Sequence, residues 1–221
     1  MWRWCIGVCI VVAAVAQAQD VRPFSLQRKG LRVGMVGTTF VGADAEGASM
    51  QANLSAGGFA VFALRRFTGG ELGLQVEVLY TRRTTEQDIQ LGGGGYTLRY
   101  DLAYVELPLL VRLATTVGRS MLAPALGIVP AFRLSGELEQ AIPNSVPRPV
   151  GASFHTADLG FVAGIGTELA LRRSARLLVD VRLQLGTRSV LREELKPPLR
   201  ENEPLRQLRV LSLGLYAGVG F

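Results

Sequence analysis

The C-terminal segment, residues 207–221, constrains the fold of this chain more than any other part of the sequence. Its alternate positions form one wholly apolar row: Leu211, Leu213, Leu215, Ala217, Val219 and Phe221. The intervening row is small or weakly polar: Val210, Ser212, Gly214, Tyr216, Gly218 and Gly220. Only a β-strand separates such rows, because successive strand side chains point to opposite faces. A strand with one continuously apolar face fits the lipid-facing wall of a membrane barrel.

The N-terminus predicts export. A short positive start, Met1-Trp2-Arg3-Trp4, precedes an apolar run from Cys5 to Ala14, and small residues follow at Ala16-Gln17-Ala18. This order is typical of a cleaved signal peptide, here residues 1–18. The apolar run is far shorter than the ~20 residues of a membrane-spanning helix. We therefore expect one mature domain over residues 19–221, with both cysteines removed and no disulfide to stabilise it.

Composition argues against nucleic-acid binding. The formal net charge is +6, but the arginines are scattered singly, with no basic helix face and no aromatic stacking set. We expect some arginines to pair with carboxylates inside a barrel and others to meet lipopolysaccharide phosphates at the cell surface. The planar guanidinium suits both tasks because it binds carboxylate or phosphate at two points.

Eight strand-like segments can be drawn, each long enough for the ~9–11 residues of a tilted membrane strand. They span residues 30–40, 57–67, 71–83, 96–112, 119–133, 156–170, 175–188 and 207–221. The gaps between them alternate in length. Short gaps follow the second, fourth and sixth segments, whereas the others, 41–56, 84–95, 134–155 and 189–206, are long. Short turns on one side and long loops on the other predict an eight-stranded antiparallel up-and-down barrel in the outer membrane, with both termini in the periplasm.

The polar rows of these strands predict what fills the barrel. The candidate interior residues are Glu77, Glu106, Arg112, Glu168, Asp180 and Arg182. An eight-stranded barrel is just wide enough for side chains to fill, and buried charges require partners. We expect an ion-pair plug, with a narrow ion path as the alternative. Periodicity does not orient the rows; the export signal and Phe221 favour the polar row inside. Pro124 and Pro130 predict a bulge or break in segment 119–133 because proline removes a ladder donor.

A family resemblance begins at Tyr104-Val105-Glu106-Leu107-Pro108-Leu109-Leu110. This stretch resembles the Y-x-E-x-P-x-L strand of the PorT-like outer-membrane β-barrel family, which is common in Bacteroidetes. The layout of most of the chain is similar too, and the C-terminal strand resembles the signal that bacterial barrel-assembly machinery reads, ending at Phe221. The resemblance implies a Gram-negative outer-membrane protein; one relative takes part in protein export. It brings no catalytic or ligand residues; on our interpretation Glu106 points inward and Pro108 marks an irregularity.

Sites with other chemistry are weakly supported. His155 is the single histidine, and Ser153-Phe154-His155 lacks the His-x-Ser spacing of lipid A deacylases. One histidine cannot form a multi-histidine metal site. Gly92 to Gly95 leads into another strand, so we expect a hairpin tip and not a phosphate loop. We therefore assign no catalytic, cofactor-binding or metal-binding residue and expect no cofactor.

The expected function is non-enzymatic: a structural, adhesive or export-assisting role through the outer loops. Two proline-rich loops, around Pro143–Pro149 and Pro197–Pro204, are the best candidates for a protein partner. Outer-membrane lipid and lipopolysaccharide are the other expected partners. The alternatives are a lipid A-modifying enzyme, which would depend on His155, and a soluble lipocalin-like ligand-binding barrel, which would place the apolar rows inside. A small channel is a third alternative.

Overall fold

The computed structural model describes residues 24–42, 45–91, 94–140, 148–149, 155–171, 174–189 and 209–221. The predicted signal peptide and the loop around Pro197–Pro204 lie outside these residues. Within them the chain is all-β, and no helix is long and apolar enough to cross a membrane. The strands are β1 (Ser25–Val41), β2 (Ala48–Phe67), β3 (Gly70–Leu91), β4 (Gly94–Glu106), β5 (Leu109–Val117), β6 (Ser120–Gln140), β7 (Arg148–Pro149), β8 (Ala157–Ala170), β9 (Arg176–Gly186) and β10 (Arg209–Gly220).

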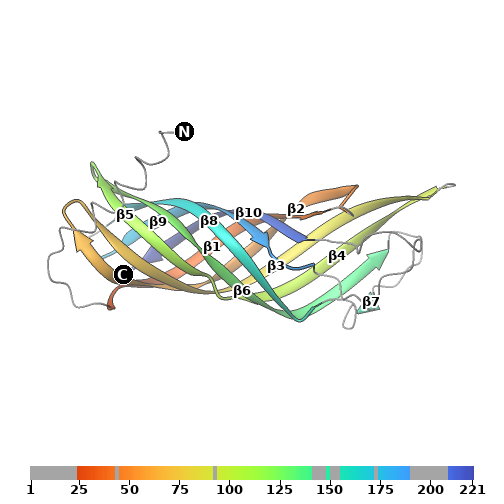
Figure 1. Cartoon of the computed structure of the whole chain (residues 1–221), viewed down its shortest axis with the longest axis horizontal. Coiled ribbons are helices and arrows are strands. Elements are labelled where there is room, and N and C mark those ends of the chain that lie inside the picture. The colour runs from red at the N-terminus through yellow and green to blue at the C-terminus, as the bar shows by residue number, and fades with distance from the viewer. Residues whose placement is uncertain are drawn as a thin grey trace, which may run out of the picture.

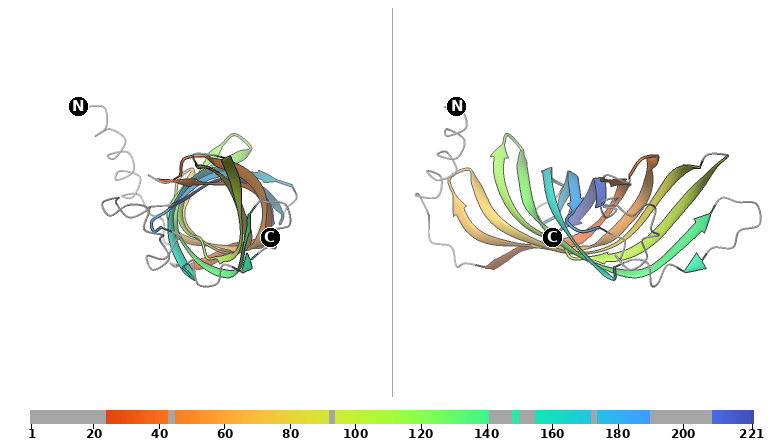
Figure 2. Two further views of the ribbon diagram at one scale, coloured as in Figure 1. Left: turned by 90° about the vertical axis from the view of Figure 1, so that its right-hand side faces the viewer. Right: turned by 45° about the vertical axis from the view of Figure 1, so that its right-hand side comes forward.

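The strands close into a ring (Figures 1 and 2). Each long strand pairs antiparallel with its neighbour, and β1 closes the ring by pairing with β10 from Gly30↔Gly220 to Val41↔Arg209. β4 and β5 lie end to end between β3 and β6, and the two-residue β7 pairs with β6 alone. The ring therefore has eight strand positions, which confirms the predicted barrel.

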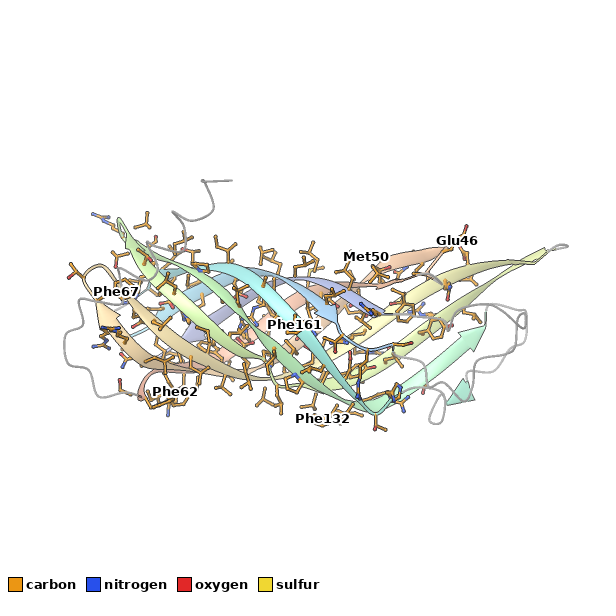
Figure 3. All side chains as sticks on the ribbon, in the orientation of Figure 1. Glu46, Met50, Phe62, Phe67, Phe132 and Phe161 are labelled. Atoms are coloured by element: carbon orange, nitrogen blue, oxygen red, sulfur yellow. The ribbon has the colours of Figure 1, made fainter. Side chains whose placement is uncertain are left out.

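Side-chain burial orients the two rows. On β10, Leu213 and Leu215 are about half exposed, whereas Ser212 and Tyr216 are buried. The same division recurs on β3, where Val78 faces outward and Glu77 inward. Phe132 and Phe161 project from the outer wall (Figure 3). The apolar rows thus form an outer belt and the polar rows fill the interior, as expected for a membrane barrel and not for a lipocalin-like one.

The two ends of the barrel differ, as predicted. At one end the connections are Thr68-Gly69, Gly118-Arg119 and residues 171–175. Gly69 and Gly118 have φ of 86° and 61°, a left-handed conformation that glycine adopts without a steric penalty. The opposite end carries the long β3–β4 hairpin and the outer part of β6 (Figure 1).

Two predicted loops are instead largely strand. Residues 41–56 and 84–95 were expected to be loops, but β2 begins at Ala48, and β3 and β4 pair out to Leu91↔Gly94. β3 has 22 residues, about twice what a membrane strand needs. Beyond the apolar belt the outward face of the hairpin meets water, so the apolar alternation stops while the backbone ladder continues. β3 and β4 form a hairpin paired as far as Leu91↔Gly94, as predicted; residues 92–93 lie outside the described part of the chain.

One expected irregularity is found at its predicted position, and the other takes a different form. Segment 96–112 is not one strand: it breaks at Leu107-Pro108 between β4 and β5, as the prediction for Pro108 implied. β6 runs unbroken through Pro124 and Pro130, and its pairing with β8 is continuous. The prolines instead interrupt the pairing of β6 with β4 and β5. That ladder lacks the pairs between Arg112↔Ala125 and Thr115↔Leu122 and between Glu106↔Ala131 and Leu109↔Ile128.

Candidate functional site in the barrel interior

All six predicted interior residues face the lumen. Glu77, Glu106, Arg112 and Glu168 are each at most 2% exposed, and Arg182 and Asp180 lie beside them. Each is engaged in at least one ion pair. Because β3 runs the length of the barrel, its inward residues Glu71, Glu77 and Arg83 order these pairs into three layers.

The first layer lies at the short-turn end. Arg28 of β1 donates to both Glu71 and Glu168, so one guanidinium joins β3 to β8. Arg112 of β5 donates to the other oxygen of Glu168 and, over 3.3 Å, to the side-chain oxygen of Gln75. Four strands are therefore tied together by this layer.

The second layer centres on Glu77, whose side chain is completely buried. Arg182 of β9 binds it at two points, with nitrogen–oxygen distances of 2.7 and 2.8 Å. Arg32 of β1 also donates to Glu77 and, with its other nitrogen, to Asp180. Asp180 in turn accepts from Arg182 Nε at 2.6 Å. Two arginines and two carboxylates thus form a closed, charge-balanced ring.

Both arginines of this layer lie against one aromatic ring. The guanidinium carbons of Arg32 and Arg182 lie 4.8 and 4.9 Å from the centre of the Tyr216 ring. Space for this ring comes from glycines: a Cβ at Gly34 or Gly214 would lie 2.4 or 2.5 Å from its atoms. Glycines of β1 and β10 therefore make room for the Tyr216 side chain.

The third layer contains the family-like motif. Glu106 accepts from Arg83 Nε at 3.0 Å and from a second nitrogen of the same guanidinium. The Tyr104 ring stacks on Arg83, 4.7 Å from the guanidinium carbon to the ring centre, and Asp158 lies 3.7 Å from Arg83 on the opposite wall. Tyr104 and Glu106 of the motif thus bind the same arginine, just before the strand break at Pro108.

An apolar cluster closes the long-loop end of the lumen. It contains Phe40, Tyr100, Leu102, Tyr104, Ala131 and Val210, and the Phe40 and Tyr100 rings meet edge to face at 5.3 Å. The sequence analysis did not predict this cluster. The sequence does show that Val36, Thr38 and Phe40 continue the inward face of β1. It does not show which residues of other strands an aromatic side chain at a strand end contacts.

Sequence reasoning also missed half of the ionic partners. Arg28, Arg32 and Arg83 supply most of the positive charge in the lumen, and Glu71 and Asp158 join them. Arg28 lies outside the predicted strand 30–40, and Arg83 lies at the end of 71–83. Alternation beginning at Arg28 would have placed Arg28 and Arg32 opposite the outward Leu31 and Val33.

The filled interior leaves little open space. The two cavities between the layers that the described residues enclose have volumes of about 30 and about 10 Å³, room for about one or two water molecules. Every carboxylate in the layers has an arginine partner, and no group of three or more potential metal ligands occurs among the described residues. The arrangement is chemically a rigid plug, in which burial strengthens each ion pair and makes an unpaired member costly.

His155 lies apart from this plug. It is partly buried and precedes β8 at the long-loop end. Ser153, the nearby serine of the sequence, lies outside the described residues. The structure therefore brings no catalytic partner to His155 in the part of the chain that it describes.

The outer wall changes from apolar to charged toward the long-loop end. On β3 the outward row passes from Val78 and Tyr80 to Arg82. Arg82 pairs with Asp101 of β4, and Arg99 lies 3.7 Å from Glu86. The arginines expected to face lipopolysaccharide therefore have carboxylate neighbours.

A family model described as "Outer membrane protein beta-barrel domain" matches residues 17–192. The chain belongs to this family. Its location is accordingly the outer membrane, in agreement with the apolar outer belt. A search of curated proteins gave no match.

The chain is similar at low identity to several solved outer-membrane proteins. OprG from Pseudomonas aeruginosa is 11% identical over 91% of this chain and 98% of its own, with a TM-score of 0.46. Ail, the attachment invasion locus protein of Yersinia pestis, is 11% identical over 90% of this chain and 100% of its own, with a TM-score of 0.42. Neisserial surface protein A is 13% identical over 88% and 97%, with a TM-score of 0.38.

Proposed function

We propose that this protein is a non-conducting, non-enzymatic outer-membrane barrel that acts through its outer end, in a structural, adhesive or export-assisting role. The observation that carries the proposal is the filled lumen. Three ionic layers and the apolar cluster occupy it, so the interior offers no route for a solute. What remains available to partners is the outer end, where β2, β3, β4 and β6 extend past the apolar belt.

The finer relationship is to PorT-like barrels. The motif from Tyr104 to Leu110 supports it, because Tyr104 and Glu106 both bind Arg83 and Pro108 sits at the strand break. Tyr104 and Glu106 are two residues apart and therefore face the same side of β4, which lets both contact Arg83. We include in this proposal the assembly machinery as a partner of the β10 strand and lipopolysaccharide as a neighbour of Arg82 and Arg99.

Shortening the β3–β4 hairpin tests the role of the outer end. Glu86 and Arg99 face each other in the ladder, so an Asn-Gly turn can replace residues 87–98 without changing the register. We expect the shortened protein to insert normally, while cell attachment to surfaces or the amount of exported protein falls toward the level of a deletion strain. Thr68→Ala, in the turn between β2 and β3 at the opposite end, is the control. Full retention of whichever phenotype the deletion abolishes would contradict the proposal.

The enzymatic alternative has its own test. A lipid A-modifying enzyme that depends on His155 would leave altered lipid A in a deletion strain and in a His155→Ala strain. We expect the mass spectrum of lipid A to be identical in the wild-type and both mutant strains. A matching change in both mutants would overturn the non-enzymatic assignment.

A further inference from the structure

The exposed charged side chains at the short-turn end are all basic in the described part of the chain. Lys29 of β1, Arg65 and Arg66 of β2, and Arg119 in the β5–β6 turn surround this end. We call these four residues the basic rim. Lys29, Arg66 and Arg119 are exposed, Arg65 is half-buried, and Arg66 donates to the side-chain oxygen of Gln27.

The carboxylates of the same end do not neutralise the basic rim. Glu71 and Glu168 point into the barrel, where they are 7% and 2% exposed and already bind Arg28 and Arg112. Among the described residues, no ion pair involves a member of the basic rim. The interior network thus holds the acidic groups inward and leaves a net positive outer edge.

The opposite end has a different charge arrangement. There two outward arginines lie beside carboxylates, Arg82 with Asp101 and Arg99 with Glu86. No member of the basic rim has such a neighbour among the ion pairs of the described residues.

The basic rim lies where the apolar belt stops. On the outward row of β1, Lys29 comes directly after Leu31, which is 74% exposed. On β2, Arg65 faces Leu72, the last apolar residue of the outward β3 row at this end. Phe62 and Phe67, which flank the two arginines in sequence, lie at the same end (Figure 3). Basic side chains next to interfacial aromatic residues are placed at the level of lipid headgroups.

We propose that the basic rim binds the phosphate headgroups of anionic phospholipids in the periplasmic leaflet of the outer membrane. Short turns mark the periplasmic end of a bacterial barrel, so this end meets the inner leaflet. The charge of the rim complements phosphate, and arginine donates to phosphate oxygens at two points. The barrel then prefers anionic lipids in the periplasmic leaflet, because the acidic groups at this end are held inside the barrel and do not pair with the basic rim.

Lipid retention in mixed nanodiscs tests this proposal. The refolded mature protein is placed in nanodiscs of phosphatidylcholine and phosphatidylglycerol, and native mass spectrometry counts the lipids that stay bound. Arg65→Gln/Arg119→Gln removes two charges from the rim, and Arg188→Gln/Arg209→Gln removes two exposed charges from the opposite end as the matched control. Heat-modifiable gel migration verifies that each variant is folded.

We expect the wild type and the control to retain phosphatidylglycerol preferentially. The rim variant is expected to lose the preference by about fivefold per removed charge at low salt, with smaller differences at high salt. Equal retention of both lipids by the wild type would overturn the proposal. An equal loss in both variants would also overturn it, because the effect would then follow net charge and not the rim.

Discussion

At the scale of single residues, Glu77 has the most demanding position in the protein. Its carboxylate is completely buried and is the shared acceptor for Arg32 and Arg182. Burying one charge is costly, and the cost is offset only when the geometry is good and all partners are present. Glu77 is therefore a residue whose removal affects two further charges.

Glu77→Gln should destabilise the folded barrel by about 3–5 kcal/mol, because Arg32 and Arg182 then share Asp180 alone and one buried positive charge stays uncompensated. Asp101→Asn, which breaks the exposed pair with Arg82, should cost about 1 kcal/mol or less. Urea titration of both variants in lipid vesicles, followed by gel migration of the folded form, measures the difference. Similar losses for the two variants would contradict the central role of the second layer.

Tyr104 acts through its ring. Because the ring face stacks on Arg83, Tyr104→Phe keeps the cation–π contact, whereas Tyr104→Leu removes it. We expect the leucine variant to be less stable than the phenylalanine variant by about 1–2 kcal/mol in the same urea titration. If the phenylalanine variant were the weaker one, the hydroxyl and not the ring would be the important group.

At the scale of strands, the sequence predicts what lies in the membrane better than what lies beyond it. β10 was predicted to within a few residues because lipid requires an apolar residue at every second position. β3 was predicted to end eight residues early, since beyond Tyr80 the outward row becomes Arg82, Thr84 and Glu86. The pairing of Glu86 with Arg99 is made by backbone groups, so the alternation of side chains does not predict it.

A substitution at Phe221 allows the assembly of the barrel in cells to be tested separately from its stability. The backbone of Phe221 exchanges two hydrogen bonds with Lys29, of 2.9 and 3.1 Å, but its side chain is 65% exposed. Phe221→Ala should therefore leave the packed interior intact and lower the unfolding free energy by about 1–2 kcal/mol at most, through the apolar area withdrawn from lipid. If assembly machinery reads this residue, the same variant should accumulate less folded barrel in cells. Quantifying the heat-modifiable fraction in outer membranes and after refolding in vitro tests both parts; equal cellular yields would argue against recognition of Phe221.

At the scale of the whole molecule, the predicted plug is confirmed but is more complete than expected. Alternation identifies which residues face inward, so Glu77, Glu106, Glu168 and Arg182 could be predicted. It does not give the stagger between strands, which decides that Arg28 meets Glu71 and Glu168 and that Arg83 faces Asp158. The apolar cluster around Phe40 and Tyr100 has the same origin, because it forms only when β1, β4, β6 and β10 are brought together.

This layered filling predicts that the barrel does not conduct ions. The refolded protein should give no discrete current steps in planar bilayers, because ionic layers and an apolar cluster lie in series along the lumen. Phe40→Ala/Tyr100→Ala removes two of the cluster's three aromatic rings and leaves Tyr104 and the three ionic layers, so it should also be silent. A variant that also replaces Arg32 and Glu77 by alanine should be silent as well when gel migration shows it folded, because the first and third layers remain. Steps in the wild type, or in the variant that lacks the two aromatic rings alone, would show that the ionic layers do not seal the lumen.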